Sequence, residues 1–458
     1  MSKKRDKKLE YEITTLESFL DDNSSIQLHP SDIAKILKNI KNSDEERYVY
    51  YLKMVPNEIL GDVVLELPEQ YLKDVIEEIP SNRLSEAVKE LESDDATDLI
   101  QDIEEIDEDK AEEVLSGLDE NEQKDIKKLS SYEDDEAGAY MQTELFSARL
   151  NEKIEDAVRR LRQQKEEGKL ENVHQVYIVD EFGRLLFTVS LEDLITFDFS
   201  KTFKEAFGDQ IEESGIRYAK DTTKIDDVLH IFEEYDLSAL PVIDKDGRLI
   251  GRITSDDIYD LIQENATEQI YNLAGVSDEA EHEDNLLITG QKRAVWLFIN
   301  LGTAILASLV IGFFESTIQQ YVALAVLMPI VASMGGNAGT QTLTVVVRQL
   351  ALGEIDLQNA KNALKKEVLI AVINGILFAL VMGLIAFLWF NDTKLGFVIA
   401  LAMVINLFAA GFFGAVIPLL LKKLHIDPAV GSTVLLTTVT DVVGFFAFLG
   451  LAKVFLLG

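Results

Sequence analysis

The sequence contains no cysteine and only five histidines: His29, His174, His230, His282 and His425. Without cysteine the chain forms no disulfide, iron–sulfur cluster or thiolate zinc site. The histidines are scattered and show no HxxxH spacing, so hard, oxygen-ligated cations fit this chain better than soft metals. The sequence also lacks a P-loop and any nucleophile–base constellation, which argues against an enzyme. The first residues precede no apolar core, so no signal peptide is predicted.

Charge is distributed very unevenly along the 458 residues, which contain 43 Lys or Arg and 80 Asp or Glu. Residues from Leu286 onward hold 10 basic and 7 acidic side chains, which leaves 33 and 73 for residues 1–285, a net charge of −40. An acidic half of this kind disfavours nucleic acid and anionic lipid as partners and attracts divalent cations. Its simplest interpretation is a solvated, self-repelling surface.

Short amphipathic helices are predicted in series over residues 31–134, after an N-terminal segment of residues 1–30. Ser31, Ser93 and Asp107 lie near the expected helix starts, where they would supply N-caps. Helices this short cannot bury their apolar faces alone. We therefore expect them to stack into an all-α, superhelical N-terminal domain.

An internal duplication follows, because residues 177–194 match residues 241–258 with a constant offset of 64. Each copy predicts a strand, a Gly-containing turn, a second strand and a helix. The pattern resembles a tandem pair of α/β CBS modules, which we place at residues 135–200 and 201–262.

The CBS resemblance implies a nucleotide site. Thr254 and Asp257 of the second copy match the positions that hold a nucleotide's phosphate and ribose, so the resemblance implies ATP as a ligand there. The first copy has Ser190 and Asp193 at the matching positions. ATP is thus an expected ligand of either copy, with the second as the better match.

The last part of the chain predicts a membrane domain over residues 286–458, after a polar connecting helix at residues 263–285. Five apolar spans are long enough for a hydrocarbon core of ~30 Å: 294–314, 321–347, 368–390, 396–421 and 429–456. Lysines and arginines gather on one side of these spans. The positive-inside rule then places the acidic half in the cytoplasm and, with five spans, the C-terminus outside the cell membrane.

Two polar features interrupt the spans. Met334–Gln341 contains three glycines together with amide and hydroxyl side chains, and such a tract at membrane depth must be buried in protein or line a watery path. Asp441 lies in the last span, where a charge costs ~2.5–3.5 kcal/mol. Together they predict a path for cations.

The membrane half resembles the MgtE family of magnesium channels in several short motifs: Pro329–Gln341, Arg348, Gly353-Glu354, Asp427-Pro428-Ala429 and Thr440-Asp441. The order of parts is also the same: acidic helical domain, paired CBS modules, plug-like connecting helix and five spans. The resemblance implies a homodimer with one pore on its two-fold axis. It also implies that Mg²⁺ is the permeant ion and that cytosolic Mg²⁺ closes the pore.

Asp441 is the first candidate for holding the hydrated ion, although an aspartate satisfied by the neighbouring threonines 437, 438 and 440 is the alternative. Oxygens of Asn337, Thr340 and Gln341 are expected near the same path. The glycines of the tract would let helices approach closely and expose carbonyls, or would serve helix packing only. Asn406 lines the path or, more simply, bonds between helices.

Two further acids are expected at the cytosolic mouth of the path. Glu367 starts the third span, and Asp427 precedes Pro428 at the start of the fifth. Both would recruit cations. The alternative for Asp427 is an ordinary helix N-cap ahead of Pro428.

A cytosolic Mg²⁺ sensor would use carboxylates of several parts of the acidic half, bridged by the ion. The candidates are Asp94, Asp95, Asp98, Asp226, Asp256, Asp257, Asp260, Glu264 and Glu268. A solvated surface remains the alternative for each of them.

Two other functions stay open from the sequence. A secondary transporter coupled to Na⁺ or H⁺ would need more buried titratable groups and clearer inverted repeats. A membrane-anchored receptor that conducts nothing would leave the glycine tract and Asp441 unexplained.

Overall fold

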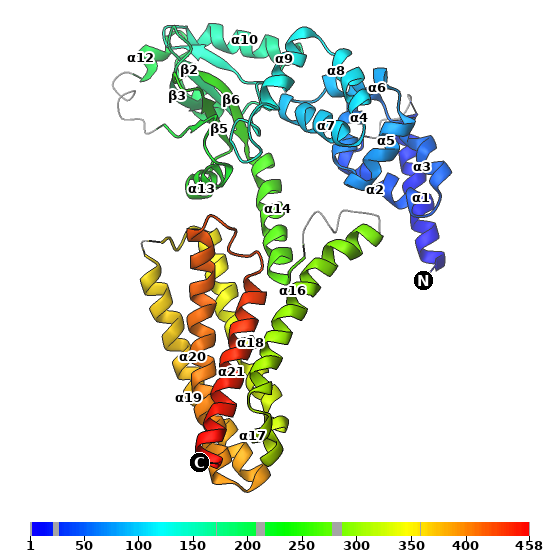
Figure 1. The fold of residues 1–458 in the computed structure, drawn as a ribbon. Coiled ribbons are helices and arrows are strands. Elements are labelled where there is room, and N and C mark those ends of the chain that lie inside the picture. The colour runs from blue at the N-terminus through cyan, green and yellow to red at the C-terminus, as the bar shows by residue number, and fades with distance from the viewer. Residues whose placement is uncertain are drawn as a thin grey trace. The chain divides into compact units, whose positions relative to one another are not determined.

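The structure is a computed structural model that describes residues 2–21, 27–170, 172–207, 216–276, 286–357 and 359–457, without the side chains of residues 2–6 and 69. It divides into two compact units, Met1–Ile262 and Gln263–Gly458. The expected multidomain architecture is confirmed: an all-α domain and an α/β pair in the first unit, and a helical membrane domain in the second (Figure 1).

The N-terminal domain is a stack of short helices around one apolar core. Alternate helices pack on each other, α2 on α4, α4 on α6 and α6 on α8, and Ile33, Leu37 and Leu60 are fully buried between them. The helices are α1 (Ser2–Leu20), α2 (Pro30–Lys41), α3 (Glu45–Leu52), α4 (Asn57–Leu65), α5 (Leu72–Glu78), α6 (Ser81–Lys89), α7 (Ser93–Ile106), α8 (Glu108–Ser116) and α9 (Glu120–Leu129), with a 3-10 turn, η1 (Glu69–Tyr71), before α5.

Of the three predicted N-caps in this domain, one is confirmed. The Asp107 carboxylate accepts from the backbone N–H of Lys110 at 3.0 Å and begins α8. The prediction for Ser31 is wrong, because Pro30 occupies the first position of α2 and the cap is His29. Ser93 is also wrong, because α7 already begins there, after the extended backbone of Glu92.

The duplicated region forms two three-stranded sheets. Strands β1 (Ser147–Arg149), β2 (Gln175–Val179) and β3 (Leu185–Ser190) make one sheet, and β4 (Ala219–Lys220), β5 (Ala239–Ile243) and β6 (Leu249–Thr254) make the other. In each, the middle strand is parallel to the first and antiparallel to the third. The accompanying helices are α10 (Ile154–Glu166), α11 (Leu191–Leu194), α12 (Phe203–Phe207) and α13 (Ile225–Tyr235).

The two hairpin turns confirm the 64-residue duplication in detail. Gly183 and Gly247 both have a φ of +80°, which favours glycine in these tight turns. The turns also bond to each other, since Leu185 N donates to Gly247 O at 3.1 Å and Leu249 N donates to Gly183 O at 3.0 Å. The two copies therefore associate as a pseudo-symmetric pair.

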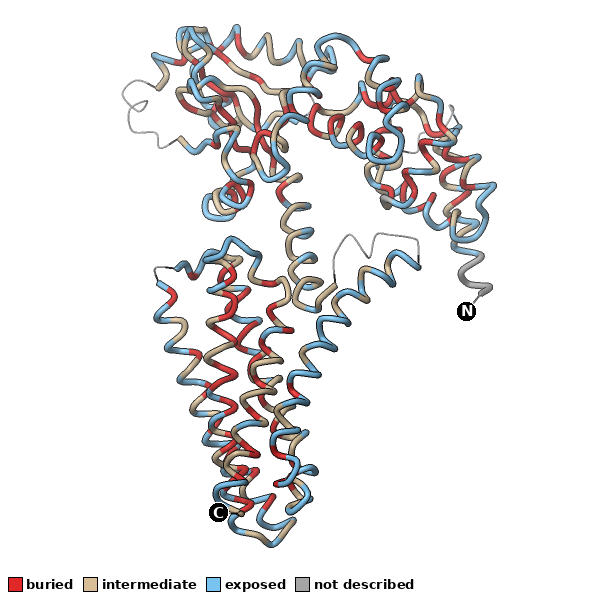
Figure 2. Tube along the Cα trace, in the orientation of Figure 1, coloured by how far each residue is buried: buried red, intermediate tan, exposed pale blue. Residues whose placement is uncertain are grey.

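Five helices of the second unit are long and apolar enough to cross a membrane, as predicted. They are α16 (Leu286–Gly312), α18 (Ala323–Ala351), α19 (Ala360–Phe390), α20 (Thr393–Lys423) and α21 (Ser432–Leu456), with a short helix, α17 (Glu315–Gln320), after the first. Helix α20 is the most buried and packs on α18, α19 and α21 (Figure 2). Helices α16 and α19 expose most of their apolar side chains.

The expected connecting helix is corrected. Residues 263–274 do not start a new helix, because they continue α14 (Ser255–Ala274), which begins directly after β6. The helix ends before Gly275, whose φ of +71° suits a helix terminus. Residues 277–285 lie outside the described residues.

Candidate metal sites

Asp441 lies half-buried on α21, within the apolar bundle. In the described parts of the chain, no hydrogen bond or ion pair reaches its carboxylate. The threonines offered as alternative partners donate instead to their own helix, Thr437 to Thr433 O at 3.0 Å, Thr438 to Val434 O at 2.6 Å and Thr440 to Thr437 O at 3.1 Å. The alternative that they satisfy Asp441 is therefore wrong, and the carboxylate is available to water or a cation.

The glycine tract lies within α18, which continues as one helix through Pro329 and all three glycines. The tract therefore does not interrupt the helix, and the exposure of its carbonyls to a path stays a prediction. Close packing explains Gly339, because a Cβ there would lie 3.0 Å from the Leu436 side chain of α21. Gly336 differs, since its Cβ would meet nothing within 4 Å.

The polar side chains expected near the path do not share one environment. Asn337 is exposed on the isolated chain and donates to Ser333 Oγ at 3.3 Å, and Gln341 is also exposed. Asn406 of α20 is fully buried and donates its amide to Val331 O of α18 at 2.8 Å. It bonds between helices, as the simpler interpretation predicted.

The end of α14 is bonded to the start of α21, and we call this contact the α14–α21 joint. Asn272 donates to Asp427 Oδ2 at 3.1 Å, and Thr433 Oγ1 donates to Leu273 O at 2.7 Å. The Leu273 side chain packs into the apolar cluster that contains Leu436 of α21. The joint therefore ties the last turn of α14 to the helix that carries Asp441.

The two mouth acids have different surroundings. Asp427 is exposed and accepts from the backbone N–H of Ala429 at 2.9 Å. It therefore caps the turn after it and not α21, which begins only at Ser432, so the expected helix cap is corrected. Glu367 is 7% exposed in the first turns of α19.

Asp94, Asp95 and Asp257 are three largely buried carboxyl groups of the first unit with raised pKa values, and we call them the acidic cluster. Asp94 of α7 is 5% exposed, and its Oδ1 is buried without a hydrogen-bond partner among the described residues. Burial, with the charge of Asp257 next, raises the pKa of Asp94 well above its usual range. The same two causes raise the pKa of Asp95 to about 6. Burial raises the pKa of Asp257 to about 6, although its hydrogen bond from Thr254 opposes the shift.

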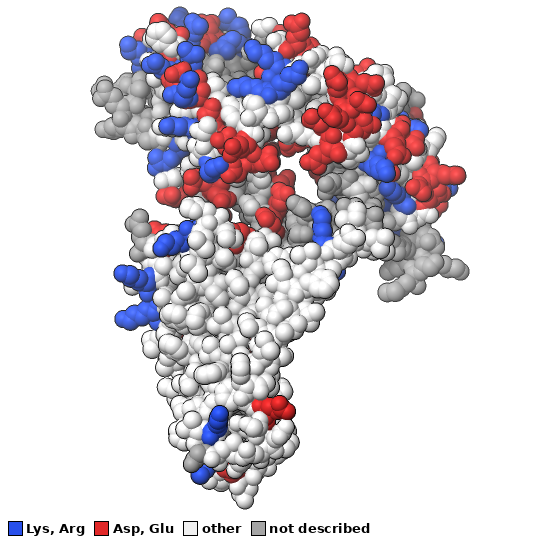
Figure 3. All heavy atoms as spheres, in the orientation of Figure 1, with Lys and Arg blue, Asp and Glu red and all other residues white. Residues whose placement is uncertain are grey.

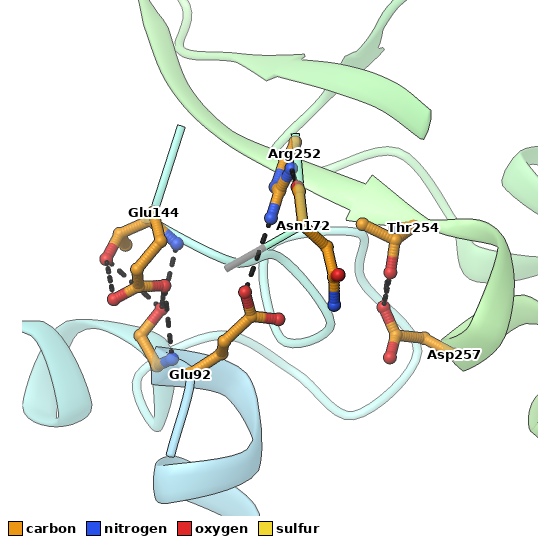
Figure 4. A network of polar contacts seen from close by, with 8 residues as sticks. Glu92, Glu144, Asn172, Arg252, Thr254 and Asp257 are labelled. Carbon is orange, nitrogen blue, oxygen red and sulfur yellow. Dashed lines mark hydrogen bonds and ion pairs between the residues drawn. The ribbon is translucent and has the colours of Figure 1, made fainter. Parts of the chain in front are cut away.

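A polar network holds α7 against the CBS pair and so creates this cluster (Figure 4). Glu144 accepts from Ser93 N at 3.2 Å and Ser93 Oγ at 2.9 Å, at the first residue of α7. Arg252 of β6 is 3% exposed and pairs with Glu92 at 3.4 Å, while it also donates to Asn172 O. These contacts fix the N-terminal end of α7 beside the start of α14.

The remaining sensor candidates are only partly gathered. Asp256 and Asp260 lie close enough to raise the pKa of Asp95 further. The other candidates stay predictions: Asp98, Asp226, Glu264 and Glu268. No group of three or more His, Asp or Glu side chains in the described ranges is arranged to enclose a metal ion. A cation here would be held by carboxylate pairs, partly through its waters.

In each CBS copy, the two candidate nucleotide-binding residues form a hydrogen bond with each other. Thr254 is 2% exposed, and its hydroxyl donates to Asp257 Oδ2 at 2.8 Å at the start of α14. Ser190 and Asp193 make the equivalent bond at 2.8 Å in the first copy. In addition, the acidic surroundings of Asp257 would repel a phosphate. The arrangement adds no support for ATP, which stays a prediction for this chain.

The residues that join α7 to the CBS pair and α14 to α21 were not predicted from the sequence. Arg252 carries a signal in retrospect, because the 64-residue offset aligns this buried cation with Thr188. Asn272 and Thr433 carry none, since their bonds join residues more than 150 positions apart.

Comparison with known proteins agrees with this arrangement. Residues 328–451 match the family model for MgtE, a divalent cation transporter. Residues 28–135 match the MgtE intracellular N domain, and residues 137–199 and 211–264 match the CBS domain. The magnesium transporter MgtE of Thermus thermophilus is 32% identical over 335 residues, 72% of each chain.

The chain belongs to the MgtE family. The magnesium transporter MgtE of Enterococcus faecalis is 33% identical over 73% of this chain and 72% of its own length. Among solved structures, the cytosolic domain of the Mg²⁺ channel MgtE in complex with ATP is 30% identical, with a TM-score of 0.46, and covers 51% of this chain and 91% of that chain. The family thus accounts for the membrane helices together with the cytosolic N domain and CBS pair.

Proposed function

We propose that the chain forms a Mg²⁺-selective channel for magnesium uptake and homeostasis in the cell membrane, closed by Mg²⁺ in the cytosol. The observation that carries the proposal is Asp441, a carboxylate on an apolar helix that no described residue bonds. Mg²⁺ prefers oxygen ligands and keeps most of its waters, so a carboxylate facing a wide path suits it. The relatives named as magnesium transporters support Mg²⁺ as the ion.

The pore in this proposal belongs to a homodimer. A single carboxylate cannot surround a hydrated cation, whereas two Asp441 side chains across a two-fold axis hold it from both sides. The mutual repulsion of the two carboxylates favours binding of a divalent cation over a monovalent one. The exposed apolar faces of α16 and α19 leave area for both lipid and a second copy.

The acidic cluster is the core of the proposed sensor. At low Mg²⁺, the charges of Asp94, Asp95 and Asp257 oppose the approach of α7 to α14. Bound Mg²⁺ removes this repulsion and shifts the population toward the compact state. Acidic side chains gather over the helices of the N-terminal domain in Figure 3, and such a surface raises the local cation concentration.

Helix α14 links this sensor to the pore by chain continuity, because it runs unbroken from Ser255 to Ala274. Mg²⁺ bound at the start of α14 stabilises one position of this helix. Because the α14–α21 joint bonds the end of α14 to α21, the same ion also favours one position of α21. Glu264 and Glu268 along α14, with Asp427 and Glu367, attract cations to the cytosolic mouth. In this topology the C-terminus lies outside.

The proposal is tested by growth of a Mg²⁺-transport-deficient host at limiting Mg²⁺. The wild-type chain should rescue growth, Asp441→Ala should not, and Glu315→Ala, which removes an exposed acid far along the chain from the path, should rescue fully. Equal rescue by the wild type and Asp441→Ala would reject the pore assignment. A secondary transporter is separated by its need for a Na⁺ or H⁺ gradient. The described spans offer it only Asp441 and Glu367 as acids.

A further inference from the structure

A buried amide at the centre of the membrane bundle joins the two helices that carry the candidate path residues. Asn406 of α20 is 0% exposed, and its Nδ2 donates to Val331 O of α18 at 2.8 Å. Its Oδ1 is buried and has no hydrogen-bond partner among the described residues. A buried polar atom without a partner costs stability. An apolar residue would avoid that cost, so stability alone does not explain an amide here.

The amide lies between two glycines of different helices. A Cβ on Gly335 of α18 would clash with the amide nitrogen and lie 2.8 Å from Asn406 Cγ. A Cβ on Gly444 of α21 would lie 2.8 Å from the amide nitrogen and 3.0 Å from Cγ. Neither glycine can therefore gain a side chain unless Asn406 moves. Helices α18, α20 and α21 meet at a slot that fits one planar amide.

This slot adjoins the candidate path residues along both helices. Gly335 precedes Asn337 by two positions, and Gly444 follows Asp441 by three. At 1.5 Å per residue these separations are about 3 Å and 4.5 Å along the helix axes. Since packed helices move as rigid elements, a change in the width of the slot changes the spacing of Asn337 and Asp441.

We propose that Asn406 is a positioning residue for ion selectivity. It does not touch the ion. It holds α18 and α21 at the spacing at which the path accepts hydrated Mg²⁺ and disfavours Ca²⁺, a larger ion with looser coordination. This inference rests on the proposed Mg²⁺ path and adds the residue that sets its geometry.

The test is the ratio of Mg²⁺ to Ca²⁺ entry into vesicles that contain the full-length protein. Asn406→Ala, Gly335→Ala and Gly444→Ala should each lower this ratio, by roughly tenfold. Gly450→Ala is the matched control on α21, because its Cβ would lie no closer than 3.8 Å to Phe314, an ordinary contact. It should leave the ratio unchanged.

A double variant tests the slot itself. Asn406→Ala removes the group that a Cβ on Gly335 would strike, so Gly335→Ala should change neither the ratio nor the melting temperature further in that background. Independent, additive effects would overturn the slot. If Gly335→Ala alone fails to fold, the double variant still tests the slot, because it is compared with Asn406→Ala.

Two other results separate this inference from the proposed function. If Asn406→Ala lowers Mg²⁺ and Ca²⁺ entry equally, or changes only the melting temperature, its role is structural and the inference fails while the path stands. If Asp441→Asn, measured alongside, conducts like the wild type, the path itself is rejected, and the inference with it.

Discussion

The first unit places its buried carboxylates beside other acids, whereas the second unit places Asp441 half-buried on an apolar helix. The strongest electrostatic neighbours of Asp95 are all acidic, although Arg252 lies nearby and pairs instead with Glu92. Asp441 lies on a helix whose threonine hydroxyls turn back to their own backbone. Among the described residues, neither the acidic cluster nor Asp441 forms an ion pair with a protein cation.

The two regions differ in the effect that a bound cation would have on the protein. In the proposed sensor, a cation at the acidic cluster removes repulsion between α7 and the start of α14, so binding changes conformation. Around Asp441, the helices are already packed on one another, so in the proposed channel a cation passes without being needed for folding. Neutral substitutions should therefore have opposite consequences: loss of regulation in the first unit and loss of conduction in the second.

The largest effect on the soluble half is expected from Arg252→Ala, which would break the contact that brings α7 to the CBS pair. Removing one partner of a buried ion pair costs about 3–5 kcal/mol, so protease cleavage of the full-length protein should accelerate markedly with or without Mg²⁺. The control is Arg159→Ala, whose side chain is 70% exposed and pairs with Glu155 and Asp156 at the surface. Equal cleavage of the two variants would contradict the role of the polar network.

A smaller and opposite effect is expected from Asp94→Asn. Burial raises the pKa of all three carboxyls of the acidic cluster, and the charge of Asp257 adds to the shift at Asp94 and Asp95. Removing one charge should therefore stabilise the Mg²⁺-free contact between α7 and the start of α14 by about 1–3 kcal/mol. Cleavage without Mg²⁺ should slow toward the Mg²⁺-bound rate, and Mg²⁺ should have little further effect.

Glu104→Gln is the control for Asp94→Asn, because Glu104 is exposed on the same helix. It should keep the wild-type response to Mg²⁺. If Asp94→Asn also keeps that response, the acidic cluster is not the sensor.

The smallest effect is expected at the α14–α21 joint. Thr433→Val removes the hydrogen bond to Leu273 O, worth about 1 kcal/mol, and should raise the Mg²⁺ concentration that closes the channel about fivefold. Thr438→Val is matched to it, because that hydroxyl bonds within α21 to Val434 O. Vesicle flux at graded Mg²⁺ measures both, and identical closing curves would mean that the joint does not transmit the signal.

Sequence reasoning succeeded where the physics is local. Five spans follow from apolar length alone, and the hairpins at Gly183 and Gly247 follow from turn chemistry repeated at a fixed offset. Asp107 was found as a cap because the carboxylate and its N–H partner lie three residues apart. Ser31 and Ser93 failed because the start of a helix depends on the backbone of the preceding residues, which residue type alone does not determine.

The rest depends on contacts between distant parts of the chain. Glu92 and Arg252 are 160 positions apart, so their ion pair has no local pattern. Asn406 was expected to bond between helices, but its place between Gly335 and Gly444 follows from the packing of three helices. The partners of Thr437, Thr438 and Thr440 likewise became clear only from the side-chain directions on α21.

We propose that Asp441 lines a Mg²⁺ path that needs no second gradient. The initial rate of Mg²⁺ entry, measured with no Na⁺ or H⁺ gradient in vesicles that contain the wild-type chain or Asp441→Asn, tests this directly. The account predicts that the wild-type rate follows the Mg²⁺ gradient alone and that Asp441→Asn lowers it by about a hundredfold, equivalent to ~2.7 kcal/mol, at unchanged melting temperature. Equal rates for the two proteins, or a wild-type rate that requires a second gradient, would contradict it.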